Sequence, residues 1–390
     1  MTQDSILSRK PPAPLPLSVL TGFLGAGKTS LLNQLLKDPA LADTVVLINE
    51  FGEIGLDHLL IERVDSDMIL LASGCLCCTI RGDLVATLED LLKRRDNGRM
   101  PPFARVIVET TGLADPAPIL QTLMYHPYLM LRFRLDGVIT VVDAINGAAT
   151  LKAHDEARRQ VAVADRLVIA KSDLAQSPAE RAALASLREE LRSINPAARV
   201  LDAAAGEASA ASLLDAGFFS LDGKTADVAG WLNVQAYADA RHDNHGHDHH
   251  SHDLAQNRHD VNRHDAAIRA FCLTSDVPIA ASAFDMFLAL LRSAHGPKLL
   301  RLKGIVALAD DPARPVVIHG VQHVFHTPQR LAAWPDADHR TRMVFIVRDL
   351  PRAFVDGLWS ALTGGIAPDQ PDIAAISANP LKAGAGGLLG

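Results

Sequence analysis

The sequence contains 390 residues, of which 48% are hydrophobic and 21% are charged, a composition that is typical of a globular protein and excludes a disordered chain. At roughly 150 residues per domain, this length predicts two or three domains. The net charge of −7 argues against a nucleic-acid binder. No apolar run reaches the ~18 residues of a membrane-spanning helix, and the first residues lack the apolar segment of a secretory signal, so we expect a cytoplasmic protein without membrane contact.

Short apolar segments of strand length alternate with helical segments through the N-terminal half of the chain. The expected strands are Leu17–Thr21, Val45–Asn49, Met68–Ala72, Arg105–Glu109, Gly137–Val142 and Arg166–Ala170. The expected helices are Lys28–Lys37, Leu84–Arg94, Ala117–Met124 and Ala179–Arg192. Asp115 and Pro116 are typical of the N-cap and the first residue of the third helix. This alternation predicts an α/β fold, with a mostly parallel sheet and helices on both faces.

The composition changes after this half of the chain. Residues 239–265 hold eight of the sixteen His together with Asp, Asn and Arg, and the scarcity of apolar residues predicts a mobile linker. Further strands are expected over Ala267–Thr274, Ile305–Leu308, Val316–Phe325 and Met343–Val347, and helices over Ala280–Ser293 and Arg352–Leu362. They predict a smaller α+β domain. The expected boundaries are 1–14 for a flexible lead-in, 15–235 for the α/β domain, 236–265 for the linker, 266–364 for the α+β domain and 365–390 for a flexible tail.

A phosphate-binding loop follows the first expected strand. The segment LTGFLGAGKTSLL satisfies the pattern G-x-x-x-x-G-K-[ST], and it lies between a strand and an amphipathic helix, as the pattern requires. Gly22, Gly25 and Gly27 allow backbone N–H groups to converge on phosphates. Lys28 supplies a positive charge for the β- and γ-phosphates, and the Thr29 hydroxyl is a ligand for Mg²⁺. The alternative is a Gly-rich turn that binds nothing.

The segment LVIAKSDL is similar to the guanine-reading [NT]-K-x-D motif of GTPases. Asp173 can accept hydrogen bonds from N1–H and the exocyclic amine of guanine, a pair of donors that adenine lacks. The stem of Lys171 can cover the face of the base. Ala170 stands where Asn is commonest, so we expect guanine preference with lower affinity. The alternatives are a surface Lys beside a helix-capping Asp, and an adenine-nucleotide enzyme.

Two further strand ends carry acidic residues. Glu109 ends the apolar strand of VIVETTG, where a carboxylate can hold Mg²⁺ through water or orient the attacking water, and the N–H of Gly112 can approach the γ-phosphate. A helix cap is the alternative for Glu109. Asp143 ends the strand of ITVVDA at the same edge of the sheet, and both a structural role and a role in the site stay open for it.

The loop INEFGEIGLD follows the second expected strand. It carries Asn49, Glu50, Glu53 and Asp57 beside glycines, at the place where a nucleotide-sensing switch is expected. An ordinary polar loop is the alternative.

Three of the four cysteines lie together in SGCLCCT, at the end of the third expected strand. Thiolates of Cys75, Cys77 and Cys78 can converge on one soft cation such as Zn²⁺ and leave a fourth position open for exchange. A redox pair of Cys75 with Cys78 and three separately buried thiols are the alternatives. Cys272 is expected in the core of the second domain.

The histidines form two groups. Those of the linker are predicted to buffer a transition metal as accessory ligands: His245, His247, His249, His250 and His252. In HGVQHVFHT, strand periodicity predicts that His319 and His323 share one face of a strand and that His326 lies on the other, with structural or partner-facing roles.

Together these motifs resemble the CobW-type family of P-loop GTPases, which is related to the nickel-delivery GTPases HypB and UreG. The resemblance also rests on GVQHVFHTPQ and RMVFIVRDL, which are similar to the C-terminal domain of that family. It implies that Gly25–Thr29, including Ala26, hold phosphate and Mg²⁺ with the adjoining Ser30, that Lys171 and Asp173 hold the base, and that the cysteine trio holds the metal. Glu50 and Glu53 are secondary candidates for metal ligands.

The resemblance implies a GTPase that forms GDP and phosphate and delivers a transition metal, zinc first and cobalt second, to a client metalloprotein. Turnover is expected on the order of 10⁻⁴–10⁻² s⁻¹, because no arginine finger is identifiable. The alternatives are a metal store with a regulatory nucleotide site and a cobalamin-pathway accessory that handles cobalt. The client and the oligomeric state, including a homo-oligomer, stay open.

Overall fold

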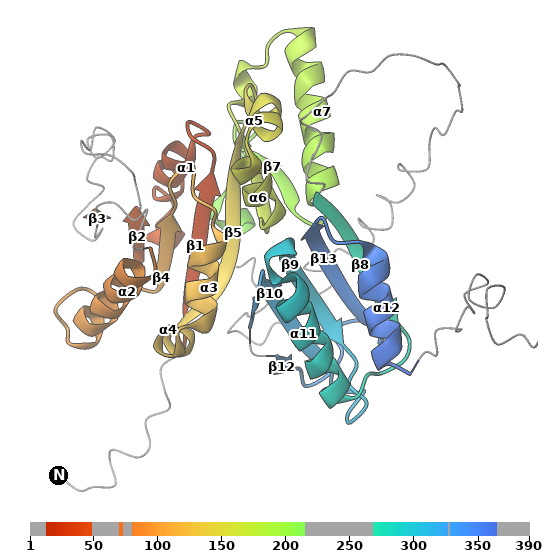
Figure 1. Ribbon diagram of the computed structural model, residues 1–390. Coiled ribbons are helices and arrows are strands. Elements are labelled where there is room, and N and C mark those ends of the chain that lie inside the picture. The colour runs from red at the N-terminus through yellow and green to blue at the C-terminus, as the bar shows by residue number, and fades with distance from the viewer. Residues whose placement is uncertain (1–12, 49–69, 73–79, 215–267, 327, 365–390) are drawn as a thin grey trace, which may run out of the picture.

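A computed structural model describes residues 13–48, 70–72, 80–214, 268–326 and 328–364. Figure 1 shows two sheets, each with its own helices. Among the described residues, no helix is long and apolar enough to span a bilayer.

The first sheet has seven strands, all parallel, in the order β3-β2-β4-β1-β5-β6-β7. The strands are β1 (Leu15–Gly22), β2 (Thr44–Ile48), β3 (Leu70–Ala72), β4 (Arg105–Glu109), β5 (Phe133–Asp143), β6 (Arg166–Ala170) and β7 (Arg199–Asp202). This sheet confirms the expected α/β class. The sequence analysis missed β7, a short strand at the edge of the sheet, and the start of β5, which carries the polar residues Arg134 and Asp136.

Helices cover both faces of this sheet. They are α1 (Lys28–Leu35), α2 (Ile80–Asp96), α3 (Ala117–Tyr125), α4 (Pro127–Arg132), α5 (Gly147–Ala153), α6 (Asp155–Ala162), α7 (Pro178–Ile194) and α8 (Ala210–Leu213). Side chains of a strand alternate between the faces, so Val45 and Leu47 pack with α2 and α3 while Val46 and Ile48 pack with α1 and α8. Leu167 and Ile169 of β6 face α6 and α7.

One expected helix start and one expected cap need correction. α2 begins at Ile80, four residues before the expected Leu84. α3 begins at Ala117 as expected, but its N-cap is Pro116 rather than Asp115, although the carboxylate of Asp115 accepts a hydrogen bond from the N–H of Ala117 at 2.9 Å.

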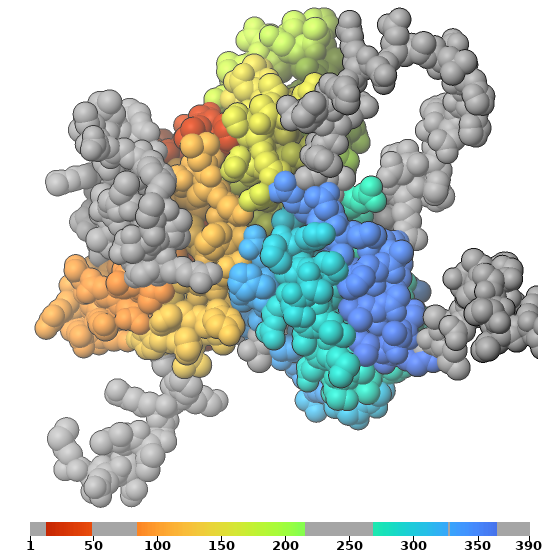
Figure 2. Space-filling view, viewed as in Figure 1, coloured from red at the N-terminus to blue at the C-terminus, as the bar shows by residue number. Residues whose placement is uncertain are grey.

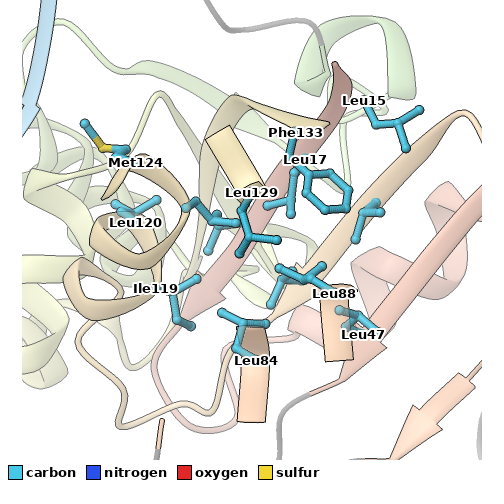
Figure 3. Packing of buried hydrophobic residues seen from close by; sticks show 14 of the residues in the cluster. Leu15, Leu17, Leu47, Leu84, Leu88, Ile119, Leu120, Met124, Leu129 and Phe133 are labelled. Atoms are coloured by element: carbon cyan, nitrogen blue, oxygen red, sulfur yellow. The ribbon is translucent and has the colours of Figure 1, made fainter. Parts of the chain in front are cut away.

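The largest core cluster lies between the sheet and helices α2, α3 and α4 (Figure 3). Leu88 of α2, Leu120 of α3 and Leu129 of α4 are fully buried there against Leu17 of β1. Burial of one such side chain contributes about 1.5–3 kcal/mol. This cluster fixes α2 and α3, the helices that follow the cysteine motif and the Gly112 loop, onto one face of the sheet.

The second sheet is antiparallel, in the order β11-β10-β9-β13-β8, with β12 beside β10. Its strands are β8 (Ile268–Ser275), β9 (Leu299–Val306), β10 (Val316–Val321), β11 (Val324–Phe325), β12 (Gln329–Arg330) and β13 (Thr341–Arg348). Helices α11 (Ala281–His295) and α12 (Arg352–Leu362) both pack on one face of it. The expected smaller α+β unit is confirmed.

The single strand expected over Val316–Phe325 is wrong. The chain turns between β10 and β11, where Gln322 adopts the left-handed region at φ 55°, and the two strands pair with each other. His319 therefore lies in β10 and His323 in the turn, and they do not share a strand face. The strand expected over Ile305–Leu308 lies instead at Leu299–Val306.

The open face of the second sheet packs against the first domain, and the surfaces of the two domains touch (Figure 2). At this contact Asp165 accepts hydrogen bonds from Arg301 and Lys303 of β9, each at 2.6 Å, and from the N–H of Val138 at 2.9 Å. The Asp165 side chain is only 5% exposed. Burial raises the pKa of Asp165, but the two cations outweigh it and hold the pKa well below its ordinary value.

Candidate nucleotide-binding site

The loop between β1 and α1 needs its glycines. Gly25 and Gly27 have φ angles of 70° and 102°, in the left-handed region that favours glycine. A Cβ at Gly22 would lie 2.4 Å from the carbonyl oxygen of Val141. The loop therefore brings its backbone close to β5 and ends at the N-terminus of α1, which is the arrangement that binds phosphate groups.

Two polar side chains of α1 lie at the mouth of this loop. Lys28 is buried, and its Nζ donates to the carbonyl oxygen of Phe23 at 3.3 Å. The Thr29 hydroxyl donates to Oε1 of Glu109 at 3.0 Å, and Glu109 is 1% exposed at the end of β4. A hydroxyl and a carboxylate are oxygen donors of the kind that Mg²⁺ takes, so this pair fits a magnesium ion beside a phosphate loop. Buried Ala26 and exposed Ser30 flank the pair.

The segment after β4 lies directly against the phosphate loop. Thr110 donates from its N–H to the carbonyl of Leu20 at 2.9 Å and from its hydroxyl to the hydroxyl of Thr21 at 2.8 Å. A Cβ at Gly112 would lie 2.5 Å from the backbone nitrogen of Leu24. Glycine is therefore required at position 112 for the two loops to meet.

Lys171 joins the end of β6 to the phosphate loop. Its Nζ donates to the carbonyl oxygen of Gly25 at 2.6 Å and to Oδ2 of Asp143 at 2.7 Å. Asp143 also accepts from the N–H groups of Ile145 and Asn146 at 2.8 and 3.0 Å. Burial raises the pKa of Asp143, but these hydrogen bonds outweigh it and the pKa lies below its ordinary value. Asp143 thus has a structural role in tying the loops.

The two residues that flank Lys171 differ in exposure. Ala170 is buried, and a Cβ at Gly27 would lie 3.4 Å from the Cβ of Ala170. The small side chain at 170 therefore packs against the phosphate loop, and the Lys171–Gly25 contact supplies a tie between the loops. Asp173 is exposed in the short 3₁₀ turn Ser172–Leu174. Sequence reasoning missed the Lys171–Gly25 contact, because it joins residues that are far apart in the chain.

The loops after β1, β4, β5 and β6 thus meet at the carboxyl edge of the parallel sheet, where open α/β sheets bind ligands. A cavity of about 280 Å³ opens between the phosphate loop, the end of β5 and helices α5 and α6. Its lining includes Gly25, Ala26, Asp143, Gln160 and Lys171.

Several predicted site residues lie outside the described residues. They are Glu50, Glu53, the cysteine trio Cys75, Cys77 and Cys78, and the histidines of the linker. Within the described ranges, no group of three or more His, Cys, Asp or Glu is arranged to hold a metal ion. The metal ligands therefore stay predictions.

The fourth cysteine and the second-domain histidines are placed. Cys272 is buried opposite Val344 of β13, as expected of a core residue, and burial raises the pKa of its thiol to about 11. His319 lies opposite Lys303 in the sheet, its carbonyl accepting from the N–H of His326 at 2.8 Å. Burial, with Arg301 and Lys303 nearby, holds the pKa of His319 well below 6.5.

Comparison with known proteins agrees with this geometry. The nucleotide-binding domain of the CobW/HypB/UreG family matches residues 16–202, and the cobalamin synthesis protein CobW C-terminal domain matches residues 268–363. The zinc chaperone YjiA of Escherichia coli is 31% identical over 90% of this chain and 99% of its own length. The chain belongs to the CobW family. The resemblance inferred from the motifs is confirmed.

Other known proteins are similar to this chain over different lengths. The zinc chaperone CobW of Pseudomonas aeruginosa is 31% identical over 90% of this chain and 92% of its own. The zinc-regulated GTPase metalloprotein activator 1 of Schizosaccharomyces pombe is 36% identical over 50% of this chain and 46% of its own. The crystal structure of the Zn(II)-bound YjiA GTPase from E. coli superposes with a TM-score of 0.63 at 26% identity, over 90% of this chain and 99% of that one.

Proposed function

We propose that this protein hydrolyses GTP to GDP and phosphate and uses that reaction to pass a zinc ion to a client metalloprotein. The observation that carries the nucleotide part is the convergence of four strand ends, with Thr29 bonded to Glu109 and Lys171 bonded to the phosphate loop. The metal part is supported by the cysteine trio of the sequence and by relatives that are named zinc chaperones.

The base would lie against the loop after β6. The side chain of Lys171 is fixed by its hydrogen bonds to Gly25 and Asp143, and its aliphatic stem would cover the face of the base. The exposed carboxylate of Asp173 would accept hydrogen bonds from the two guanine donors. A site built for that pair of donors rejects a base that lacks it, because its acceptor is left unpaired. We therefore expect GTP to compete far better than ATP.

Lys28 and the backbone of the phosphate loop would hold the triphosphate, and Thr29 and Glu109 would hold Mg²⁺, which neutralises phosphate charge when bound. The N–H of Gly112 is placed next to the loop by the contact with Leu24, where it can donate to the γ-phosphate. No arginine is among the described residues that line the adjoining cavity. This is consistent with slow intrinsic turnover.

The zinc ion, as cargo, would bind the thiolates of Cys75, Cys77 and Cys78 and leave through the open fourth position. β3 ends three residues before Cys75 and α2 begins two residues after Cys78. β3 is three strands from β1, so the two strand ends are about 14 Å apart at ~4.8 Å per strand. The loop with Glu50 and Glu53 follows β2, which lies between β1 and β3 in the sheet. We propose that this loop couples the bound nucleotide, GTP or GDP, to the affinity of the thiolates for zinc.

The test is a comparison of Cys77→Ser with Cys272→Ala, a thiol of the second-domain core. We expect the wild type to hydrolyse GTP with a preference over ATP and to bind one zinc ion at the cysteine trio, in addition to metal that the linker histidines hold. Cys77→Ser should lose this thiolate-bound zinc ion, and Cys272→Ala should keep it. Zinc binding that is unchanged in Cys77→Ser would overturn the metal site, and absence of GTP hydrolysis by the wild type would overturn the GTPase.

A further inference from the structure

The loop that carries Gly112 is held from α6 by one buried glutamine. Nε2 of Gln160 donates to the carbonyl oxygens of Gly112 at 3.1 Å and of Ala114 at 3.0 Å. Gln160 is 1% exposed, and its backbone carbonyl oxygen accepts a hydrogen bond from the hydroxyl of Thr140 in β5 at 2.8 Å. Gly112 is therefore enclosed between the phosphate loop, through Leu24, and α6, through Gln160.

The same helix is fastened to the C-terminal domain. Arg159 of α6 forms ion pairs with Asp115 of the Gly112 loop at 3.3 Å and with Asp155 at the start of α6 at 2.9 Å. Asp155 in turn pairs with Arg348 of β13 at 2.5 Å. A continuous set of charged contacts thus runs from the Gly112 loop along α6 into the second sheet.

Both ends of α6 make further contacts. His154, the residue before the helix, stacks on Phe23 of the phosphate loop with ring centroids 4.4 Å apart. Asp165, three residues past its end, holds Arg301 and Lys303 of β9. Figure 1 shows α6 where the two domains meet, close to β9. Together with its flanking residues, α6 therefore contacts the phosphate loop, the Gly112 loop and the second sheet.

We propose that Gln160 is a positioning residue for GTP hydrolysis, and that α6 is the element through which the C-terminal domain sets the hydrolysis rate. The inference rests on the proposed GTPase function and extends it. The carbonyl of Gly112 and its N–H, which the proposed function directs at the γ-phosphate, are separated only by the N–Cα and Cα–C bonds of that residue. Holding the carbonyl restricts rotation about these bonds and so limits the direction of the N–H before the γ-phosphate arrives, which is pre-organisation of a catalytic loop.

If Gln160 had only a structural role, its loss would lower the stability of the protein and would weaken the binding of GDP and of GTP alike. A positioning role concerns only the loop that senses the γ-phosphate, so its loss lowers kcat and leaves GDP affinity intact, because GDP lacks that phosphate. The split between kcat and GDP affinity separates the two roles.

The first variant is Gln160→Met, which keeps the length of the side chain and removes both donated hydrogen bonds. We expect kcat to fall about tenfold, equal to about 1.4 kcal/mol of activation free energy, with GDP affinity within twofold of wild type. An unchanged kcat in a folded Gln160→Met protein would overturn the role of Gln160. A tenfold loss of GDP affinity alongside kcat would also overturn it.

The second variant is Arg348→Gln. Arg348 is a half-buried residue of β13, and its replacement removes the ion pair with Asp155 that joins the C-terminal domain to α6. We expect kcat to fall about threefold, and the loss to be less than additive in the double variant with Gln160→Met, because both act through α6. The matched control is Arg340→Gln, which removes an exposed pair with Asp338 in the same domain and should leave kcat unchanged.

Each failure points to one part of the account. An unchanged kcat in Arg348→Gln overturns the link to the C-terminal domain. Wild-type protein that binds GTP but does not hydrolyse it overturns the proposed function, whereas hydrolysis that is identical in wild type and all variants overturns only this inference.

Discussion

The buried contact between the domains gives the sharpest prediction about stability. In Asp165→Asn, the carboxylate that two cations share becomes a neutral amide, while Arg301 and Lys303 stay buried at 4% and 9% exposure. Removing one partner of a buried ion pair costs about 3–5 kcal/mol, because the remaining charge is left without compensation. Since domains are stable by only about 5–15 kcal/mol, this loss is a large share of the total.

The assay is urea denaturation followed by circular dichroism, with Asp90→Asn as the matched control. Asp90 of α2 pairs with Arg94, the two side chains are 52% and 53% exposed, and such surface pairs contribute about 0–1 kcal/mol. We expect Asp165→Asn to lower the free energy of unfolding by at least 3 kcal/mol, within the cited range for broken buried pairs, and the control by less than about 1 kcal/mol.

A compensated variant distinguishes lost charge balance from lost packing. Combining Asp165→Leu with Arg301→Met and Lys303→Met replaces the whole cluster with apolar side chains, which is often neutral or stabilising in buried ion clusters. We expect this triple variant to recover most of the lost stability. A loss below about 1 kcal/mol in Asp165→Asn would refute the reasoning, because uncompensated buried charge could not then be the dominant cost.

Three other predictions concern the site and the pH response. Gly112→Ala places a Cβ 2.5 Å from the Leu24 nitrogen, so we expect kcat, measured in a phosphate-release assay, to fall at least tenfold, equal to about 1.4 kcal/mol of activation free energy. A kcat equal to that of the wild type would contradict the close approach of the two loops. Lys171→Met removes the bonds to Gly25 and Asp143, so we expect weaker GDP binding in a fluorescent-nucleotide titration; unchanged affinity would contradict the tie. His319 has a pKa well below 6.5 in the folded protein, so the unfolded chain takes up a proton that the folded chain does not, and stability falls as the pH drops through that value. Between pH 7 and 5.5 we expect the free energy of unfolding to fall in denaturant titrations of wild type and of the exposed control His339→Gln, and to fall less in His319→Gln; equal pH slopes in all three would refute it.

Features that depend on local sequence were predictable. Most residues in the strands of the first sheet are apolar because both faces are covered, and the phosphate loop is defined by glycines whose φ angles no other residue adopts easily. The proximity of Thr29 to Glu109 was predictable because both residues were candidate ligands for the same Mg²⁺ ion. In each case the residues that decide the structure lie within one element and its adjoining loop.

Features that depend on distant partners were not predictable. In β9, Arg301 and Lys303 alternate with apolar residues, a pattern typical of a solvent-exposed strand face, and their burial depends on Asp165, more than 130 positions earlier. Gln322 turns the chain with a left-handed backbone although neither Gly nor Asn marks the position. Gln160 is one polar residue in a helix of ordinary composition, and its partners belong to another strand's loop.

The claim that GTP controls the metal is tested most directly by zinc affinity in two nucleotide states. A chelator-competition titration would be run on the full chain with GDP and with a non-hydrolysable GTP analogue, each with Mg²⁺. Moving a bound population from 99:1 to 1:99 takes about 10⁴-fold in affinity, and we expect a difference of at least a hundredfold in favour of the analogue. Equal affinities in the two states would contradict the account and leave a metal store whose nucleotide does not govern release.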